Sequence, residues 1–173
     1  AGGKKVLFVG TKKQAKDIVR TAAQEVDQPF VTERWVGGTL TNSKTVGAQI
    51  KHMQQLENKM ASGDLEKRYN KLEVQRYGEE ISELNKKYGG IKNLEGKPGI
   101  VFVTDILSDA NAVREAKKLD IPVVAVVDTN ADPSDIDYVI PGNDDAIKGI
   151  SLILDYVKKA VLEGQAAVKK ETK

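Results

Sequence analysis

The chain has 173 residues, with 27 Lys and Arg against 25 Asp and Glu, one His and no Cys. This length suits one domain or one domain with a small appendage, and 40% hydrophobic residues can form a core. The lack of Cys excludes disulfides, thiolate zinc sites and Cys nucleophiles, and one His leaves a transition-metal site short of ligands. No apolar run approaches the roughly 18–20 residues of a membrane span, and no signal-peptide pattern is present. We expect a soluble protein with no metal, no cofactor and no membrane partner.

The net charge of +2 conceals an asymmetry along the chain. Residues 1–88 contain 16 basic and 11 acidic residues, whereas residues 89–173 contain 11 basic and 14 acidic ones. Such a distribution indicates one basic face and one acidic face.

Short apolar segments alternate with amphipathic ones over most of the chain. Continuous rather than alternating hydrophobicity predicts a parallel sheet covered on both faces by helices, with strands at 5–9, 30–31, 100–103, 122–127 and 137–140. The first helix follows Gly10 with Thr11 as its N-cap, and a second spans 109–119. A long closing helix spans 144–162, with Asn143 as its N-cap, and its predicted inner face consists of Ile147, Ile150, Ile153, Leu154, Val157 and Val161.

The pattern changes between residues 44 and 88, where two helical stripes replace the strands. Val46, Ile50, Met53, Leu56 and Met60 recur at helical spacing, and a break at 61–64 separates them from a second stripe that begins at Leu65 and continues through Leu72 to Tyr88. We predict an antiparallel coiled-coil hairpin inserted at 44–88 into a sheet domain formed by 1–43 and 89–163, with a flexible tail at 164–173. A hairpin that lies flat on the sheet is the alternative.

Two segments could bind anions. Residues 10–13 (GTKK) lie between a strand and a helix, but they lack the spacing of a P-loop or of a dinucleotide-binding GxGxxG motif. Residues 33–42 (ERWVGGTLTN) combine an Arg, a Gly pair, hydroxyls and an amide that suit phosphate or sugar. Trp35 could stack on a base, although a packing role at the sheet edge is favoured. The lysines of the first segment could equally form an ordinary solvated loop.

Carboxylates at the strand ends offer a second chemistry. Asp105 and Asp128, with Asp132 nearby, could hold Mg²⁺ for phosphoryl transfer. No nucleophile–base pair accompanies them, and 128–133 also has the composition of a polar turn. The polar-turn interpretation is favoured.

Five motifs in order, GTKKQA, ERWVGGTLTN, YGGI, IPVVAVVDTNADP and DYVIPGNDDAI, closely resemble the bacterial small-subunit ribosomal protein two family. The resemblance covers about residues 3–162 and implies a flavodoxin-like sheet with a protruding coiled-coil hairpin. It further implies a non-enzymatic protein of the cytoplasmic ribosome, without a small-molecule substrate. Such a protein binds small-subunit ribosomal RNA, helps to join head and body, and contacts neighbouring proteins including the largest one. The resemblance also implies a further N-terminal segment that the sequence above does not include, and an aromatic residue in many relatives where this chain has Ser43.

A structural RNA binder reads phosphates and 2′-hydroxyls through scattered basic and polar side chains. We expect these contacts to come from the start of the first helix, the loop before the hairpin, and the hairpin itself: Lys12, Lys13, Lys16, Arg34, Trp35, Thr39, Thr41, Asn42, Lys44, Lys51, Lys59, Lys67, Arg68 and Lys71. The acidic stretch 105–145 should face away from RNA. A flavodoxin-like phosphoryl-transfer enzyme and a protein-interaction scaffold are the competing hypotheses.

Overall fold

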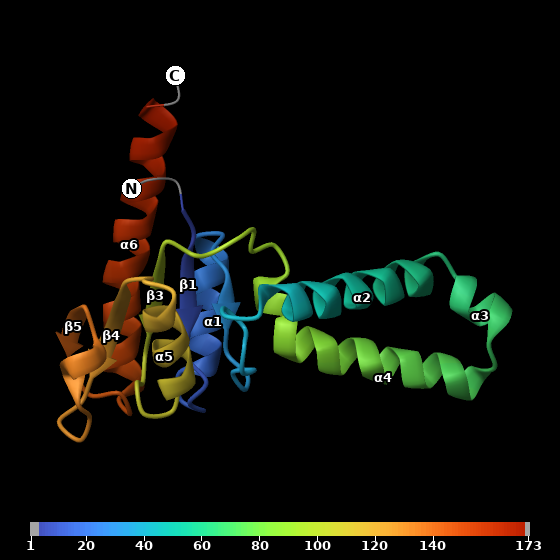
Figure 1. Ribbon diagram of the computed structural model, residues 1–173, viewed down its shortest axis with the longest axis horizontal. Helices are drawn as coiled ribbons and strands as arrows, with labels where there is room; N and C mark the ends of the chain where they lie inside the picture. Colours follow the sequence, from blue (N-terminus) through green and yellow to red (C-terminus); the bar gives the residue numbers. More distant parts are fainter. Residues whose placement is uncertain (1–3, 172–173) are drawn as a thin grey trace.

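Five parallel strands form the centre of the computed structural model, which describes residues 4–171 (Figure 1). The strands are β1 (Val6–Val9), β2 (Phe30–Val31), β3 (Ile100–Val103), β4 (Val123–Val127) and β5 (Tyr138–Pro141). They lie in the order β2-β1-β3-β4-β5, and neighbours pair in parallel throughout. This is the strand order of flavodoxin-like doubly wound sheets, in which the winding direction reverses between β1 and β3. The predicted five-stranded parallel sheet is confirmed.

Helices cover both faces of this sheet, which explains why its strands are apolar along their whole length. α1 (Lys16–Glu25) and α6 (Ile147–Glu171) pack together on one face, where Phe8 and Phe102 meet with ring centroids 5.6 Å apart. α5 (Ala110–Lys118) covers the other face, towards which Leu7 and Val101 point. Two short 3-10 turns, η1 (Gly89–Ile91) and η2 (Pro133–Asp135), lie in the connections.

Between β2 and β3 the chain forms three helices, α2 (Ser43–Ala61), α3 (Asp64–Arg68) and α4 (Lys71–Tyr88), which we call the arm. Figure 1 shows α2 and α4 side by side, extending away from the sheet, with α3 at the outer end. Met53 and Leu56 of α2 are buried, as the stripe predicts, whereas Leu72 at the start of α4 is 58% exposed. Gly63 takes a left-handed backbone (φ 71°) in the break, and Asn70 begins α4 through a capping box with Glu73.

Several helix ends differ from the prediction. α1 begins at Lys16 rather than directly after Thr11, because the Thr11 side chain bonds to Asp109 next to α5 instead of capping α1. Asn143 accepts from the backbone N–H groups of Asp145 and Ala146 in a turn, and α6 begins only at Ile147, which is 54% exposed rather than on the inner face.

The C-terminal part of the chain also differs, because α6 continues through Gly164 to Glu171 where a tail was predicted. The Gln165 side chain donates to the Val26 carbonyl at 2.9 Å and so ties this part of α6 to the end of α1. Residues 172–173 of the predicted tail lie outside the described residues. None of the helices described here has the length and apolar character needed to cross a membrane.

Candidate nucleic-acid interface

Lys12 lies in the turn after β1, at the C-terminal edge of the sheet. Its Nζ lies 2.8 Å from Asp144 Oδ1, 2.7 Å from Asp145 Oδ1 and 3.4 Å from Asp105 Oδ2. The side chains of Asp105 and Asp144 are only 4% exposed, so these carboxylates depend on the lysine for charge balance. Partial desolvation would lower the pKa of Lys12, but the surrounding carboxylates outweigh it and raise the pKa. Lys12 therefore joins the β1 and β3 loops to the start of α6 and does not point freely at a ligand.

The neighbouring Thr11 contacts another buried carboxylate. Its backbone N–H and its hydroxyl donate to the two oxygens of Asp109, at 3.1 Å and 2.7 Å, and Asp109 is 1% exposed. Burial raises the pKa of Asp109 to about 6, against the opposing effect of the Thr11 hydrogen bonds. The crevice between β1 and β3, where doubly wound folds bind ligands, is thus filled by the protein's own side chains.

The carboxylate of Glu115 organises the loop at residues 35–41. Glu115 of α5 accepts from Trp35 Nε1 at 3.0 Å, from the N–H groups of Gly38, Leu40 and Thr41, and from the Thr41 hydroxyl. Partial burial would raise the pKa of Glu115, but these donors stabilise its charge and lower the pKa. The glycine-rich loop does gather N–H groups around an anion, and that anion is an internal glutamate.

The carboxylates considered for Mg²⁺ are also engaged within the chain. Asp105 accepts from Ser108 Oγ at 2.6 Å and from the Leu107 and Ser108 N–H groups, while Asp132 caps η2 through Ser134. Across the part of the chain that the structure describes, no group of three or more His, Cys, Asp or Glu residues could hold a metal ion. The favoured polar-turn interpretation of residues 128–133 agrees with these bonds.

The predicted RNA contacts fall into two groups, of which the first is engaged in the fold. Trp35 and Thr39 are 7% and 8% exposed, and the Thr39 hydroxyl donates to the Val36 carbonyl. Trp35 packs in the hydrophobic core on the α5 side of the sheet, so its ring is not open to a base, in line with the favoured packing role. Thr41 donates to Glu115, and Lys16 pairs with Glu33 at 2.6 Å. Together with Lys12, these side chains make contacts within the chain that hold the loops of the site in place, and they do not point freely at a ligand.

The second group is exposed: Lys13, Arg34, Lys44, Lys51, Lys59, Lys67, Arg68 and Lys71. Within residues 4–168, none of these eight side chains has a hydrogen bond or an ion pair. Asn42 is exposed too, although its Oδ1 accepts from Thr45 Oγ1 at 3.0 Å. Free cations at the surface are the groups that phosphates would attract.

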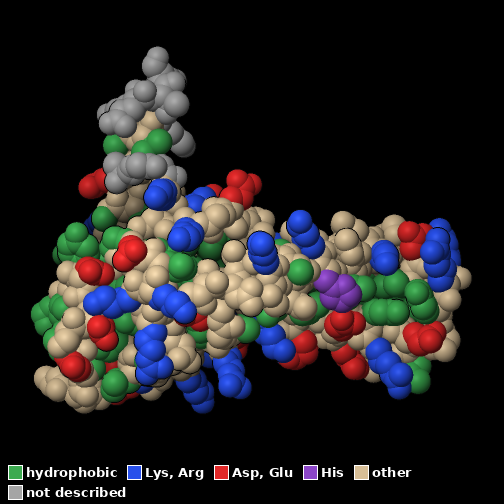
Figure 2. All heavy atoms as spheres, in the orientation of Figure 1, with side chains coloured by type: hydrophobic (Ala, Val, Ile, Leu, Met, Phe, Trp, Pro, Cys, Tyr) green, Lys and Arg blue, Asp and Glu red, His purple; other side chains and the backbone are tan. Residues whose placement is uncertain are grey.

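The outer face of α2 carries three of these cations in a row. Lys44, Lys51 and Lys59 follow one another after seven and eight residues, close to two helical turns each, so they share one face. The only acid of α2 is Glu57, which pairs with Lys92 beyond η1. Figure 2 shows basic side chains predominating along the α2 edge of the arm and both signs mixed along the α4 edge. The α2 face therefore forms a basic strip without neutralising carboxylates.

The base of the arm contains basic residues that sequence reasoning missed. Arg20 of α1 and Lys86 and Lys87 of α4 line a polar hollow of about 390 Å³ together with Glu33. Arg20 donates to Glu33 at 3.2 Å, and Lys86 pairs with Glu83 at 2.9 Å. These residues are far apart in the sequence, so only the fold reveals their grouping.

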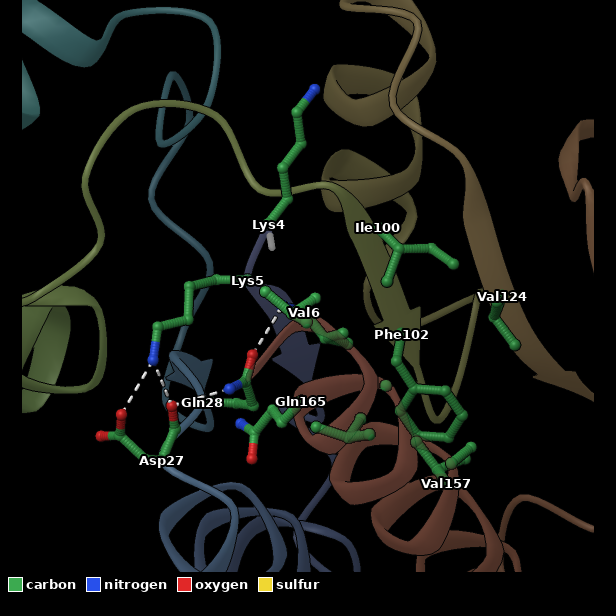
Figure 3. A pocket seen from close by; sticks show the side chains of 14 residues that line it. Lys4, Lys5, Val6, Asp27, Gln28, Ile100, Phe102, Val124, Val157 and Gln165 are labelled. Carbon is green, nitrogen blue, oxygen red and sulfur yellow. Dashed lines mark hydrogen bonds and ion pairs between the residues drawn. The ribbon is translucent and has the colours of Figure 1, made fainter. Parts of the chain in front are cut away.

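A larger groove of about 680 Å³ lies at the opposite edge of the sheet, between the strand starts and α6 (Figure 3). Its floor is apolar, with Val6, Ile100, Phe102 and Val157. On its polar rim, Lys5 Nζ lies 2.8 Å from Asp27 Oδ2 and Gln28 Oε1 accepts from the Val6 N–H, while Lys4 is exposed. The apolar floor distinguishes this groove from the basic strip of α2.

Comparison with known proteins shows the family of the chain. A small ribosomal subunit protein uS2 from Oleidesulfovibrio alaskensis is 48% identical over 173 residues, which is 100% of this chain and 66% of that protein. A protein of the same name from Roseiflexus sp. is 48% identical over 165 residues, 95% of this chain and 63% of its own length. The chain thus spans just under two thirds of the length of these relatives. The family model described as ribosomal protein S2 matches residues 1–164. By both measures, the chain belongs to the ribosomal protein S2 family.

Proposed function

We propose that this chain is a structural, non-catalytic constituent of the small ribosomal subunit and that it binds the subunit's RNA. The name of the relatives supports a place in the small ribosomal subunit. The exposed basic side chains support RNA as the ligand. The strip of Lys44, Lys51 and Lys59 on α2 is the observation that carries the proposal, because it is exposed and free of acid.

The proposed contacts recognise the shape of the RNA rather than its base sequence. Lysines spaced along a helix meet successive phosphates of an RNA backbone and make no base-specific pattern. Lys13 and Arg34 on the sheet domain, with Asn42 before α2, extend the same kind of contact beyond the arm. The bound RNA is therefore a folded ribosomal segment recognised through its backbone.

The arm allows the protein to contact RNA at a distance from the sheet domain. α2 and α4 pack along a narrow apolar stripe in the manner of an antiparallel coiled coil, inserted between β2 and β3, so the arm can touch RNA while the sheet domain rests elsewhere. This geometry suits a protein of the cytoplasmic ribosome that joins the head and body of the subunit. The acidic surface, with Asp120, Asp135 and Asp137 exposed, is left for neighbouring proteins, including the largest one of the subunit.

A pair of charge-reversal variants tests this assignment. Lys44→Glu with Lys51→Glu should weaken binding to small subunits that lack their own copy of the protein, and should make the salt slope shallower by about one for each phosphate that the variant no longer binds. Lys118→Glu with Lys148→Glu makes the same charge change on exposed residues away from the arm and should leave binding intact. Equal weakening by both pairs would mean that only net charge matters, and the α2 interface would be wrong.

A further inference from the structure

The outer end of the arm combines a cluster of basic residues with exposed apolar side chains. We define the arm tip as residues 59–72, which contain four basic residues, Lys59, Lys67, Arg68 and Lys71, against two acids, Asp64 and Glu66. The same segment exposes two large apolar side chains, Tyr69 at 41% and Leu72 at 58%. Figure 2 shows hydrophobic surface on the outer part of the arm beside basic side chains at its end.

The chain holds Tyr69 in a defined position. Its backbone is extended (φ −126°, ψ 154°) between α3 and α4, and its N–H donates to the Leu65 carbonyl at 3.0 Å. Leu65 is 3% exposed and anchors the tip, while the capping box of Asn70 and Glu73 fixes the following residue. The ring meets the ring of Tyr77 at 66°, with centroids 5.2 Å apart. An edge contact of this kind orients a ring and still leaves much of it exposed.

A fixed, exposed aromatic ring among cations matches unpaired nucleotides. Base-paired RNA hides its base faces, whereas loops and bulges present bases that stack on aromatic side chains while lysines and arginines contact the flanking phosphates. We propose that the arm tip binds an unpaired stretch of RNA by stacking a base on Tyr69, next to Leu72, with Lys67, Arg68 and Lys71 on the adjoining phosphates. This inference rests on the proposed ribosomal RNA binding and adds a site with different chemistry to the phosphate contacts of α2.

The charge of the tip favours RNA over a protein partner. Lys59, Lys67, Arg68 and Lys71 have no ion pair within residues 4–168, so the arm tip carries four cations without internal neutralisation. An apolar protein surface would have to desolvate these charges, whereas phosphates satisfy them.

Substitutions at Tyr69 test the stacking. Tyr69→Leu keeps an apolar side chain against Tyr77 but removes the platform, and should weaken binding to small subunits lacking the protein by roughly 5- to 150-fold. Tyr69→Phe keeps the ring and should bind as the wild-type chain does. Tyr156→Leu removes an even more exposed tyrosine (66%) on α6 and should likewise have no effect. Thermal unfolding of each variant checks that the arm is intact.

A second measurement does not depend on any variant. Ultraviolet cross-linking of the wild-type chain in the complex should attach a nucleotide of an unpaired segment to the peptide that contains Tyr69. If Tyr69→Leu binds like Tyr69→Phe, or if the peptide cross-links only to a protein, the tip site is wrong while the α2 interface stands. If the wild-type chain fails to bind small subunits, both proposals fail.

Discussion

Lys12 Nζ and Asp144 Oδ1 lie 2.8 Å apart although 132 positions separate them in the chain. The pair joins the turn after β1 to the turn before α6, across the edge of the sheet where a flavodoxin-like fold would bind its ligand. Asp105 and Asp145 lie near the same Nζ, so one positive charge offsets part of the charge of three carboxylates, two of them almost buried. Lys12 therefore stabilises the fold, and its substitution should lower the stability of the protein.

Lys12→Met should unfold at a lower urea concentration, because Asp144 and Asp105 lose the cation that offsets their burial. The expected loss is about 3 kcal/mol of unfolding free energy, in the range measured when one partner of a buried pair is removed. Lys13→Met, at the exposed neighbouring residue, should change stability by less than about 0.5 kcal/mol. Identical urea midpoints for the two variants would contradict the structural role of Lys12.

Glu115→Ala should release the loop at residues 35–41. The substitution leaves Trp35 Nε1 and the N–H groups of Gly38 and Leu40 without their acceptor, at a cost of about 2–4 kcal/mol. Trp35 is the only Trp, so a red shift of its emission should accompany the loss of stability. Glu163→Ala, at an exposed residue of α6, is the matched control. An unchanged emission spectrum would show that the loop holds its shape without Glu115.

Asp109→Asn should alter how stability depends on pH. Burial raises the pKa of Asp109 from 3.8 to about 6, so the folded state binds this proton more tightly than the unfolded state does. Wild-type stability therefore loses the Asp109 contribution as pH rises from about 4 to 6 and loses no more above that range.

The Asn variant keeps an acceptor for Thr11 but does not ionise. Its stability relative to wild type should grow by about 3 kcal/mol between pH 4 and pH 7. Taking the difference between the two proteins removes the opposing titration of carboxylates such as Glu115, whose pKa is lowered. A difference that stays flat across this range would show that Asp109 is ionised in the folded protein throughout.

The sheet could be predicted from the sequence because its signal is local. The apolar run at Ile100–Val103 and the stripe through Met53 and Leu56 each lie within one segment, and burial enforces them. The strand order β2-β1-β3-β4-β5 depends on pairing between distant segments and is known from the structure.

The role of single site residues could not be predicted in the same way. Glu115 lies 80 residues beyond Trp35, and Asp109 lies 98 residues beyond Thr11, so no local pattern announces either pair. In the sequence, Thr11 has the position of a helix cap and residues 37–41 have the composition of an anion-binding loop. In the structure, both bind carboxylates of the chain itself. The exposed lysines of α2 needed no such partner, and the sequence pattern placed them correctly on the surface.

Co-sedimentation of the chain with small ribosomal subunits lacking this protein, at graded salt, tests the central claim most directly. The eight predicted contact residues that are exposed and unpaired within residues 4–168 are available for phosphates. If about half or more of them make contacts, the logarithm of the binding constant should fall linearly with the logarithm of salt concentration, with a slope of about −3 to −7. Binding that does not change with salt, or no binding even at low salt, would contradict the assignment of this chain as an RNA-binding constituent of the small subunit.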